Sequence, residues 1–262
     1  MYKFQYQKAV SLDEARESYA ASDDPRYIAG GMTLLPALNL RLDRPSTLLD
    51  IGQLSELEGI EEKNGGIKVG ALSRHRDVSR SELIQDKIPA LARLASSIGD
   101  PLVRNRGTLG GSLANNDPAA DYPAAVLGLK ATIHTDQREI PADDFFQGIF
   151  ETALEQGELI TGVTFFVPED AGYGRLANPA SRFPVIGVFV AKYSDGARVT
   201  VTGSGSGVFR VPEMEKVLSQ NWSVESVKDI RVSSQGFSGD LHASAEYRTR
   251  MVTVMAERAL TR

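Results

Sequence analysis

The 262-residue sequence contains no cysteine and only three histidines, which lie far apart at His75, His134 and His242. Without cysteine the chain cannot form disulfides, ligate an iron–sulfur cluster through thiolates or build a thiolate zinc site. The scattered histidines and the absence of an HExxH motif argue against a zinc or non-haem iron centre. We therefore expect no metal site, and any redox chemistry must come from an organic cofactor.

The sequence also lacks an excess of positive charge and any long apolar run. Its 29 Lys and Arg residues against 34 Asp and Glu residues give a formal net charge of −5, which argues against binding nucleic acid mainly through charge. No run approaches the 18 apolar residues that a membrane-spanning helix needs. The charged residues 1–17 lack the apolar stretch of a signal peptide. We expect a cytoplasmic protein with no nucleic acid partner and no membrane span.

The pattern of apolar residues, glycine and proline predicts an α+β protein. Ser11 and Glu14 have the spacing of a capping box, and Ser194-Asp195-Gly196 predicts a hairpin turn. A break is expected over 168–174. Strands are expected near 2–4, 27–29, 47–51, 67–72, 131–135, 159–167, 184–191 and 197–203, and helices near 11–21, 34–42, 76–84, 89–97, 124–129, 212–219 and 245–261.

Two glycine pairs are candidate sites. One lies in Ala29-Gly30-Gly31-Met32-Thr33, between an expected strand and helix; the other lies in Thr108-Leu109-Gly110-Gly111-Ser112, within the Gly-, Asn-, Asp- and Pro-rich stretch 99–123. Glycine lets the backbone approach a ligand, and free N–H groups favour a phosphate. Either loop alone is more typical of a plain turn, but together they could hold a pyrophosphate. A valine at Gly31 or Gly110 is then expected to displace the phosphate and leave the core intact.

Several other templates do not fit. GxGxxG and the phosphate-binding GxxxxGK[ST] motif are absent, and residues 110–114 fit GxSxG only in part, with no histidine placed as a base. Asp117 and Asp121 could form an acid/base pair, although helix capping is the commoner role for such residues. We expect His75 on the surface or at a helix cap, and Trp222 in packing.

The two loops lie within segments that resemble a known family. RYIAGGMTLLPALNLRL (26–42) and VRNRGTLGGSLANNDPAADYPAAVLGL (103–129) are similar to the FAD-binding, or medium, subunit of molybdenum hydroxylases of the carbon monoxide dehydrogenase, xanthine dehydrogenase and aldehyde oxidase type. The resemblance continues through 150–165, 178–191 and 243–260. It implies a two-lobed FAD-binding region of the vanillyl-alcohol-oxidase (PCMH) type over 1–170, with lobes of about 1–55 and 56–170, and a small α+β domain over 171–262.

The resemblance also implies which residues contact FAD. Met32 and Thr33 stand where His-Ser or Thr-Asp pairs are common in the family, and Arg175 stands where Lys is usual. Neither loop has a histidine or cysteine to attach flavin, so the FAD is expected to be non-covalent. The residues that the resemblance implies as FAD contacts are Ala29, Gly30, Gly31, Met32, Thr33, Ile98, Thr108, Leu109, Gly110, Gly111, Ser112, Asp121, Ile160, Arg175 and Phe183.

The resemblance implies an oxidoreductase subunit. Electrons would pass from a molybdopterin large subunit through a [2Fe–2S] small subunit to this FAD, and then to an external acceptor, in a dimer of heterotrimers. No acid/base residue is assigned, because electron transfer needs none. Two alternatives stay open: a stand-alone FAD oxidoreductase of the same fold, and a cofactor-free scaffold protein. The organic substrate and the final acceptor are left open.

Overall fold

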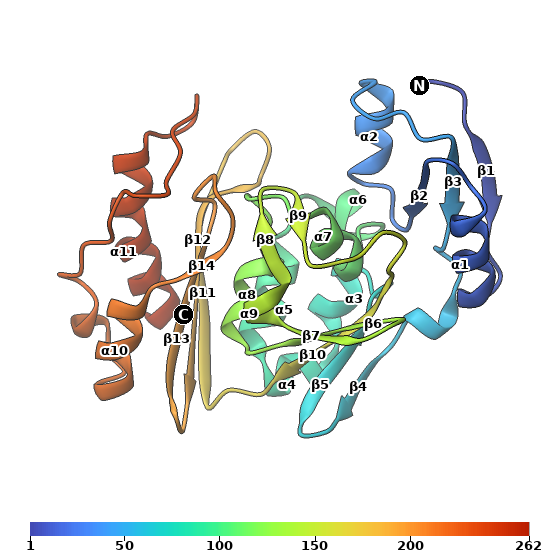
Figure 1. The fold of residues 1–262 in the computed structure, drawn as a ribbon. Coiled ribbons are helices and arrows are strands. Elements are labelled where there is room, and N and C mark those ends of the chain that lie inside the picture. The colour runs from blue at the N-terminus through green and yellow to red at the C-terminus, as the bar shows by residue number, and fades with distance from the viewer. Residues whose placement is uncertain (262) are drawn as a thin grey trace.

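The computed structural model describes residues 1–261, whose strands form three sheets and one short hairpin (Figure 1). The first sheet is parallel, in the order β1-β3-β2, with β1 (Gln5–Lys8), β2 (Pro25–Ile28) and β3 (Thr47–Asp50). The helices α1 (Leu12–Ala20) and α2 (Leu34–Asn39) connect its strands. The Ser11 hydroxyl accepts a hydrogen bond from the Glu14 N–H at 3.2 Å, which confirms the predicted cap.

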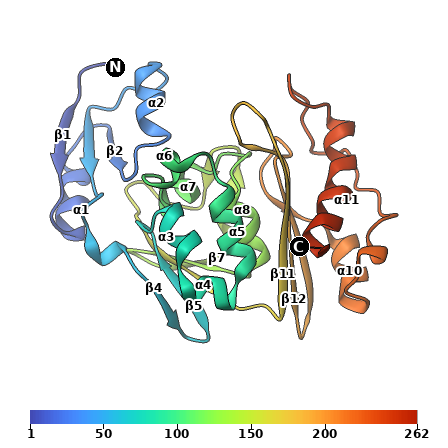
Figure 2. The same ribbon diagram turned by 180° about the vertical axis from the view of Figure 1, so that it is seen from behind.

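The second sheet is antiparallel and lies at the centre of the chain. Its order is β4-β5-β10-β6-β7, with β4 (Ile60–Lys63), β5 (Gly66–Gly70), β6 (Thr132–Thr135), β7 (Glu139–Pro141) and β10 (Ile160–Phe166). Between β5 and β6 come α3 (His75–Arg80), α4 (Glu82–Lys87), α5 (Pro89–Ser97), α6 (Pro101–Arg104), α7 (Leu109–Asn115) and α8 (Tyr122–Gly128). Figure 2 shows α3, α4 and α5 side by side.

Two of these helices lie in the glycine-rich stretch 99–123, where none was expected. Asp100 accepts hydrogen bonds from the N–H groups of Leu102 and Val103 and so caps α6. Thr108 accepts one from Gly111 and caps α7. Capping side chains stabilise such short helices by satisfying N–H groups that have no partner within the helix.

The third sheet has the order β11-β12-β13-β14 and separates two layers of helices (Figure 1). Its strands are β11 (Asp170–Ala177), β12 (Pro184–Tyr193), β13 (Gly196–Thr202) and β14 (Phe209–Arg210). The helices α10 (Pro212–Gln220) and α11 (Ala245–Thr261) cover one face, and α5 and α8 pack on the other. Remaining elements are η1 (Ser55–Leu57), α9 (Ala142–Phe145), β8 (Phe146–Gly148), β9 (Glu151–Thr152) and η2 (Val224–Ser226).

The break predicted over 168–174 is wrong from residue 170 onward, because β11 begins at Asp170. Gly172 and Gly174 belong to this strand, where α11 lies against its backbone. A Cβ at Gly172 would come 1.8 Å from the Ala259 carbonyl oxygen, and one at Gly174 would come 2.1 Å from that of Met255. These glycines therefore permit close helix–sheet packing and do not interrupt the strand.

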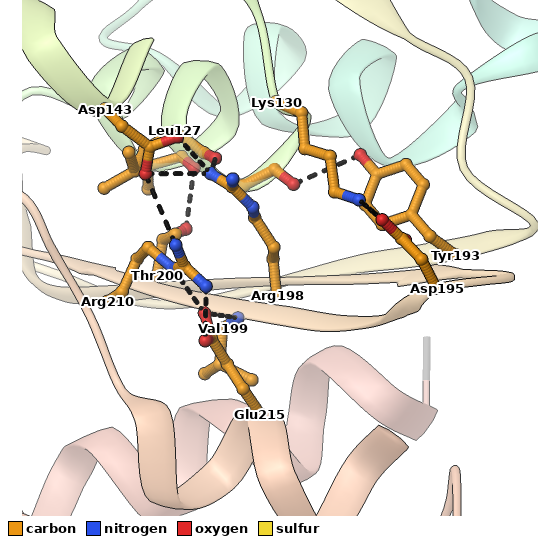
Figure 3. Close-up of polar contacts among 12 residues, drawn as sticks. Leu127, Lys130, Asp143, Tyr193, Asp195, Arg198, Val199, Thr200, Arg210 and Glu215 are labelled. Carbon is orange, nitrogen blue, oxygen red and sulfur yellow. Dashed lines mark hydrogen bonds and ion pairs between the residues drawn. The ribbon is translucent and has the colours of Figure 1, made fainter.

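A polar network joins the third sheet to the central region (Figure 3). Arg198 on β13 donates a hydrogen bond to the Leu127 carbonyl and pairs with Asp143 at 2.8 Å. Lys130 pairs with Asp195 at 2.7 Å and lies over the Tyr193 ring. One hydrophobic cluster also runs from β5 and α5 to β11 and β12. The expected boundary near 170 thus falls where two sheets share a core, and the division into domains stays a prediction.

Candidate functional site

A cavity of about 740 Å³ lies between the first sheet and the central region. Its walls come from residues 25–34, the start of α3, the stretch 98–121, the segment 150–160 and residues 181–183. Ligand-binding cavities typically enclose roughly 300–1,000 Å³. Both glycine loops that the sequence singled out lie on its wall, although the whole segment 34–107 separates them in the sequence.

The first loop, residues 29–33, presents unpaired backbone N–H groups. It follows β2 and leads into α2, and Gly31 has a φ of +73°, which L side chains rarely adopt. Within residues 1–261, the N–H groups of Gly30, Gly31, Met32 and Thr33 have no hydrogen-bond acceptor. Successive free N–H groups form a concave surface that suits an anion.

The second loop, residues 108–112, is fastened to the central region by its backbone. The Leu109 N–H donates to the Ser73 carbonyl at 3.0 Å, and the Gly110 N–H donates to the Ala71 carbonyl at 2.8 Å. A Cβ at Gly110 would lie 2.7 Å from that of Ala71. The expectation that a valine at Gly110 leaves the core intact is therefore wrong. At Gly111, by contrast, a Cβ would meet only the Thr108 hydroxyl, at 2.8 Å.

At Gly30 the first loop approaches the two residues that directly precede the second loop. A Cβ at this position would come 2.0 Å from the Arg106 carbonyl oxygen and 3.1 Å from the Gly107 Cα. Only glycine allows the two backbones to approach so closely. Gly30 therefore brings the free N–H groups of the first loop next to the start of the second.

Thirteen of the fifteen residues predicted at the site line the cavity, including Ile98, Asp121, Ile160 and Phe183; Leu109 and Arg175 do not. The Leu109 side chain is fully buried in the hydrophobic core. Arg175 lies behind the wall and pairs with Asp121. Its side chain also donates hydrogen bonds to the carbonyls of Ser97 and Arg182. Both residues thus support the wall from behind.

Asp121 is a buried carboxylate with two partners. The Arg175 Nε lies 3.0 Å from its Oδ1, and the Tyr173 hydroxyl donates to the same oxygen at 2.7 Å. Burial raises the pKa of Asp121 to about 6, and Arg175 and Tyr173 oppose part of that rise. The two partners fix the orientation of the carboxylate at the cavity wall. No side-chain capping bond links Asp121 to α8.

The wall also contains residues that were not predicted at the site, among them His75 and Phe150. His75 was expected on the surface, but it is buried, and no partner within residues 1–261 binds its Nδ1. Burial lowers its pKa to about 4, with a further contribution from Arg104, so the imidazole is neutral near pH 7. His75 closely follows the strand predicted over 67–72, which is mostly apolar, and this position could have indicated that it is buried. Phe150 also lines the cavity, and nothing local in the sequence indicates it.

The part of the chain that the structure describes contains no helix long and apolar enough to cross a membrane. The same residues contain no group of three His, Cys, Asp or Glu side chains arranged to hold a metal ion. Trp222 packs with the apolar residues of the third sheet and donates a hydrogen bond to Asp170 at 3.0 Å, which confirms its predicted packing role.

Comparison with known proteins identifies relatives over the whole chain. Residues 2–169 match the family described as the FAD binding domain in molybdopterin dehydrogenase. The chain is 34% identical to the glyceraldehyde dehydrogenase medium chain of Sulfolobus acidocaldarius, over 98% of this chain and 97% of the relative. It is 31% identical to the carbon monoxide dehydrogenase medium chain of Hydrogenophaga pseudoflava, over 98% and 96%.

The fold is similar to solved structures of such enzymes. One of them is carbon monoxide dehydrogenase from Hydrogenophaga pseudoflava, in a form that lacks the Mo-pyranopterin moiety of the molybdenum cofactor. It matches with a TM-score of 0.89 and 30% identity, over 99% of this chain and 96% of that one. Quinoline 2-oxidoreductase from Pseudomonas putida 86 matches with a TM-score of 0.89 and 26% identity, over the same shares.

Proposed function

Because the chain belongs to the FAD-binding subunits of the molybdopterin dehydrogenase family, we propose that its cavity binds FAD and relays electrons from a partner's [2Fe–2S] cluster to an external acceptor. The expected α+β fold with a PCMH-type FAD-binding region is confirmed, as is the class of oxidoreductase subunit. The observation that carries the proposal is the row of free N–H groups at Gly30–Thr33, held next to the start of the second glycine loop at the cavity.

The residues of the wall suit the parts of FAD. The free N–H groups of the first loop can bind the pyrophosphate oxygens without any charged side chain. Phe183 is partly exposed at the wall and offers an aromatic surface to a planar ring. Ile98 and Ile160 give apolar contacts. Leu109 and Arg175 would hold the second loop and Asp121 in place without touching the cofactor.

The protein's task is to bind, orient and shield the cofactor. Bound flavin accepts and releases electrons singly or in pairs, so it can link a one-electron cluster to a two-electron acceptor. Asp121, fixed by Arg175 and Tyr173, keeps a defined carboxylate at the wall. His75 adds a neutral imidazole. The chain supplies no general acid or base in this scheme, because no proton transfer to a substrate is required of it.

The proposal includes partner subunits. The chain has no cysteine, so a [2Fe–2S] cluster that reduces its flavin must belong to another subunit. Relatives carry the names medium chain and medium subunit, which describe one member of a complex. We assign the [2Fe–2S] small subunit and a molybdopterin large subunit as partners, with two such heterotrimers forming a dimer, in the cytoplasm.

Purification and flavin analysis test this function. The full chain is expected to bind one FAD per chain, and acid precipitation should release all of the flavin, because neither glycine loop has a residue for covalent attachment. Co-purification from the native host should recover an iron–sulfur chain and a molybdopterin chain. A complex without flavin would contradict the assignment of FAD. Full-rate turnover by the isolated chain with only FAD bound would favour a stand-alone oxidoreductase.

A further inference from the structure

The tip of a small hairpin places a strained aromatic residue at the cavity. The hairpin consists of β8 (Phe146–Gly148) and β9 (Glu151–Thr152), with Ile149 and Phe150 at its tip. Phe150 has a φ of +56°. A bulky L residue pays about 1–2 kcal/mol for this left-handed conformation, which glycine and asparagine adopt far more readily. A turn selected only for stability would therefore not have phenylalanine here.

Asn116 holds the tip in this conformation. Its Nδ2 donates hydrogen bonds to the carbonyls of Gly148 at 2.9 Å and Glu151 at 2.8 Å, and its backbone carbonyl accepts one from the Phe150 N–H at 3.2 Å. Asn116 is buried and is the C-cap residue of α7, the helix that begins at the second glycine loop. The strained tip is thus fastened to the same short helix that positions one wall of the cavity.

The Phe150 ring contributes little to the core. Its residue is 60% exposed, and no aromatic partner stacks on its ring among residues 1–261. It nevertheless lines the cavity, as Met32 and Phe183 do. Strain that the surrounding contacts enforce, without any gain in packing, is characteristic of residues held for a ligand.

We propose that Phe150 is an aromatic contact for one of the planar rings of bound FAD, held in place by Asn116. The inference rests on the proposed function and adds a ligand-contact residue that the two glycine loops do not contain. Both the isoalloxazine and the adenine of FAD present a flat π-surface. An aromatic side chain binds such a surface by stacking or edge-to-face contact.

Substitutions at Phe150 separate ring contact from turn formation. Phe150→Asn suits the left-handed backbone but removes the ring, so the full chain should keep or gain resistance to urea. Its dissociation constant for FAD should rise about tenfold, the scale seen when aromatic partners of stacked bases are removed. Phe150→Tyr keeps the ring and should bind FAD as the wild type does. Ile149→Ala is the control, because Ile149 is 54% exposed at the same tip but does not line the cavity.

Titrations with FMN and ADP distinguish the two rings. If Phe150→Asn weakens FMN binding but not ADP binding, the ring contacts the isoalloxazine; the reverse result assigns it to adenine. An FAD affinity within twofold of the wild type would overturn the inference, and weaker recovery of partner subunits in that variant would show that the ring serves subunit docking. A wild-type chain that binds no FAD would instead overturn the proposed function, and this inference with it.

Discussion

Arg175 on β11 and Asp121 before α8 form a buried ion pair with 3.0 Å between Nε and Oδ1. The same guanidinium donates hydrogen bonds to the carbonyls of Ser97, at the end of α5, and Arg182, next to Phe183. One side chain therefore links the third sheet to three segments at the back of the cavity wall. This arrangement makes Arg175 a positioning residue.

Replacing Arg175 with methionine should destabilise the chain strongly. Asp121 would remain buried without its countercharge, and breaking a buried pair costs about 3–5 kcal/mol. Arg175→Lys keeps a positive charge but not the forked hydrogen bonds, so its loss of stability should be smaller. Urea unfolding measures both variants. Lys192→Met is the control, since the Lys192–Glu169 pair is exposed and should contribute less than about 1 kcal/mol. Equal losses in Arg175→Met and Lys192→Met would refute the role of Arg175.

His75 should make the folded chain sensitive to mild acid. Its pKa is about 4 in the folded chain, below the ordinary 6.5, so only the unfolded chain binds the proton between these values. The contribution of His75 to the free energy of unfolding is fully present above pH 6.5. It falls as the pH drops to 4, by up to about 3 kcal/mol. Asp121, with a raised pKa of about 6, acts in the opposite direction between about pH 6 and 4.

The contribution of His75 is therefore measured as a difference. Melting temperatures of the wild type and of His75→Gln are compared at intervals from pH 7 to pH 4. The difference in melting temperature between the two proteins should shift in favour of the variant as the pH falls, because glutamine takes up no proton. A gap that stays constant over this range would mean that His75 is protonated equally in the folded and unfolded chains.

Gly110 and Gly111 should respond differently to alanine. At Gly110 the new methyl would press on Ala71, at 2.7 Å from its Cβ and 3.0 Å from its carbonyl oxygen, and overpacking of this kind costs about 1–3 kcal/mol. At Gly111 it would displace only the Thr108 hydroxyl cap, which costs about 1 kcal/mol. Because Gly111 lines the cavity, Gly111→Ala should lose FAD affinity while remaining folded. Urea unfolding and FAD titration of both variants check this, and full FAD affinity in Gly111→Ala would remove Gly111 from the site.

Asp143 should contribute to the attachment of the third sheet (Figure 3). It pairs with Arg198 at 2.8 Å and with Arg210 at 3.4 Å. Asp143→Ala leaves Arg198 largely buried with only the Leu127 carbonyl as acceptor, so we expect a loss of about 1–3 kcal/mol in urea unfolding. Asp144→Ala is the matched control, because the Asp144 side chain has no ion pair within residues 1–261. A loss in both variants alike would point to α9 itself and not to the pairing.

The sequence by itself determined the features that depend on neighbouring residues. Ser11 caps α1 because its hydroxyl reaches an N–H three residues further along the chain. The glycine loops were recognisable for the same reason, since a turn and the helix after it need particular residues at adjacent positions. The lack of cysteine alone placed any iron–sulfur cluster outside this chain.

Tertiary structure decided what each of these residues contacts. The phosphate contacts of Gly30 and Gly110 stay a prediction from the sequence, whereas the structure shows that Gly30 also allows the close approach of Arg106 and that Gly110 packs on Ala71. Burial of His75 and the strained backbone of Phe150 likewise depend on residues distant in sequence. Local patterns specify which conformations a segment can adopt, but only the folded chain determines which distant atoms a side chain meets, because those contacts arise from the packing of whole elements.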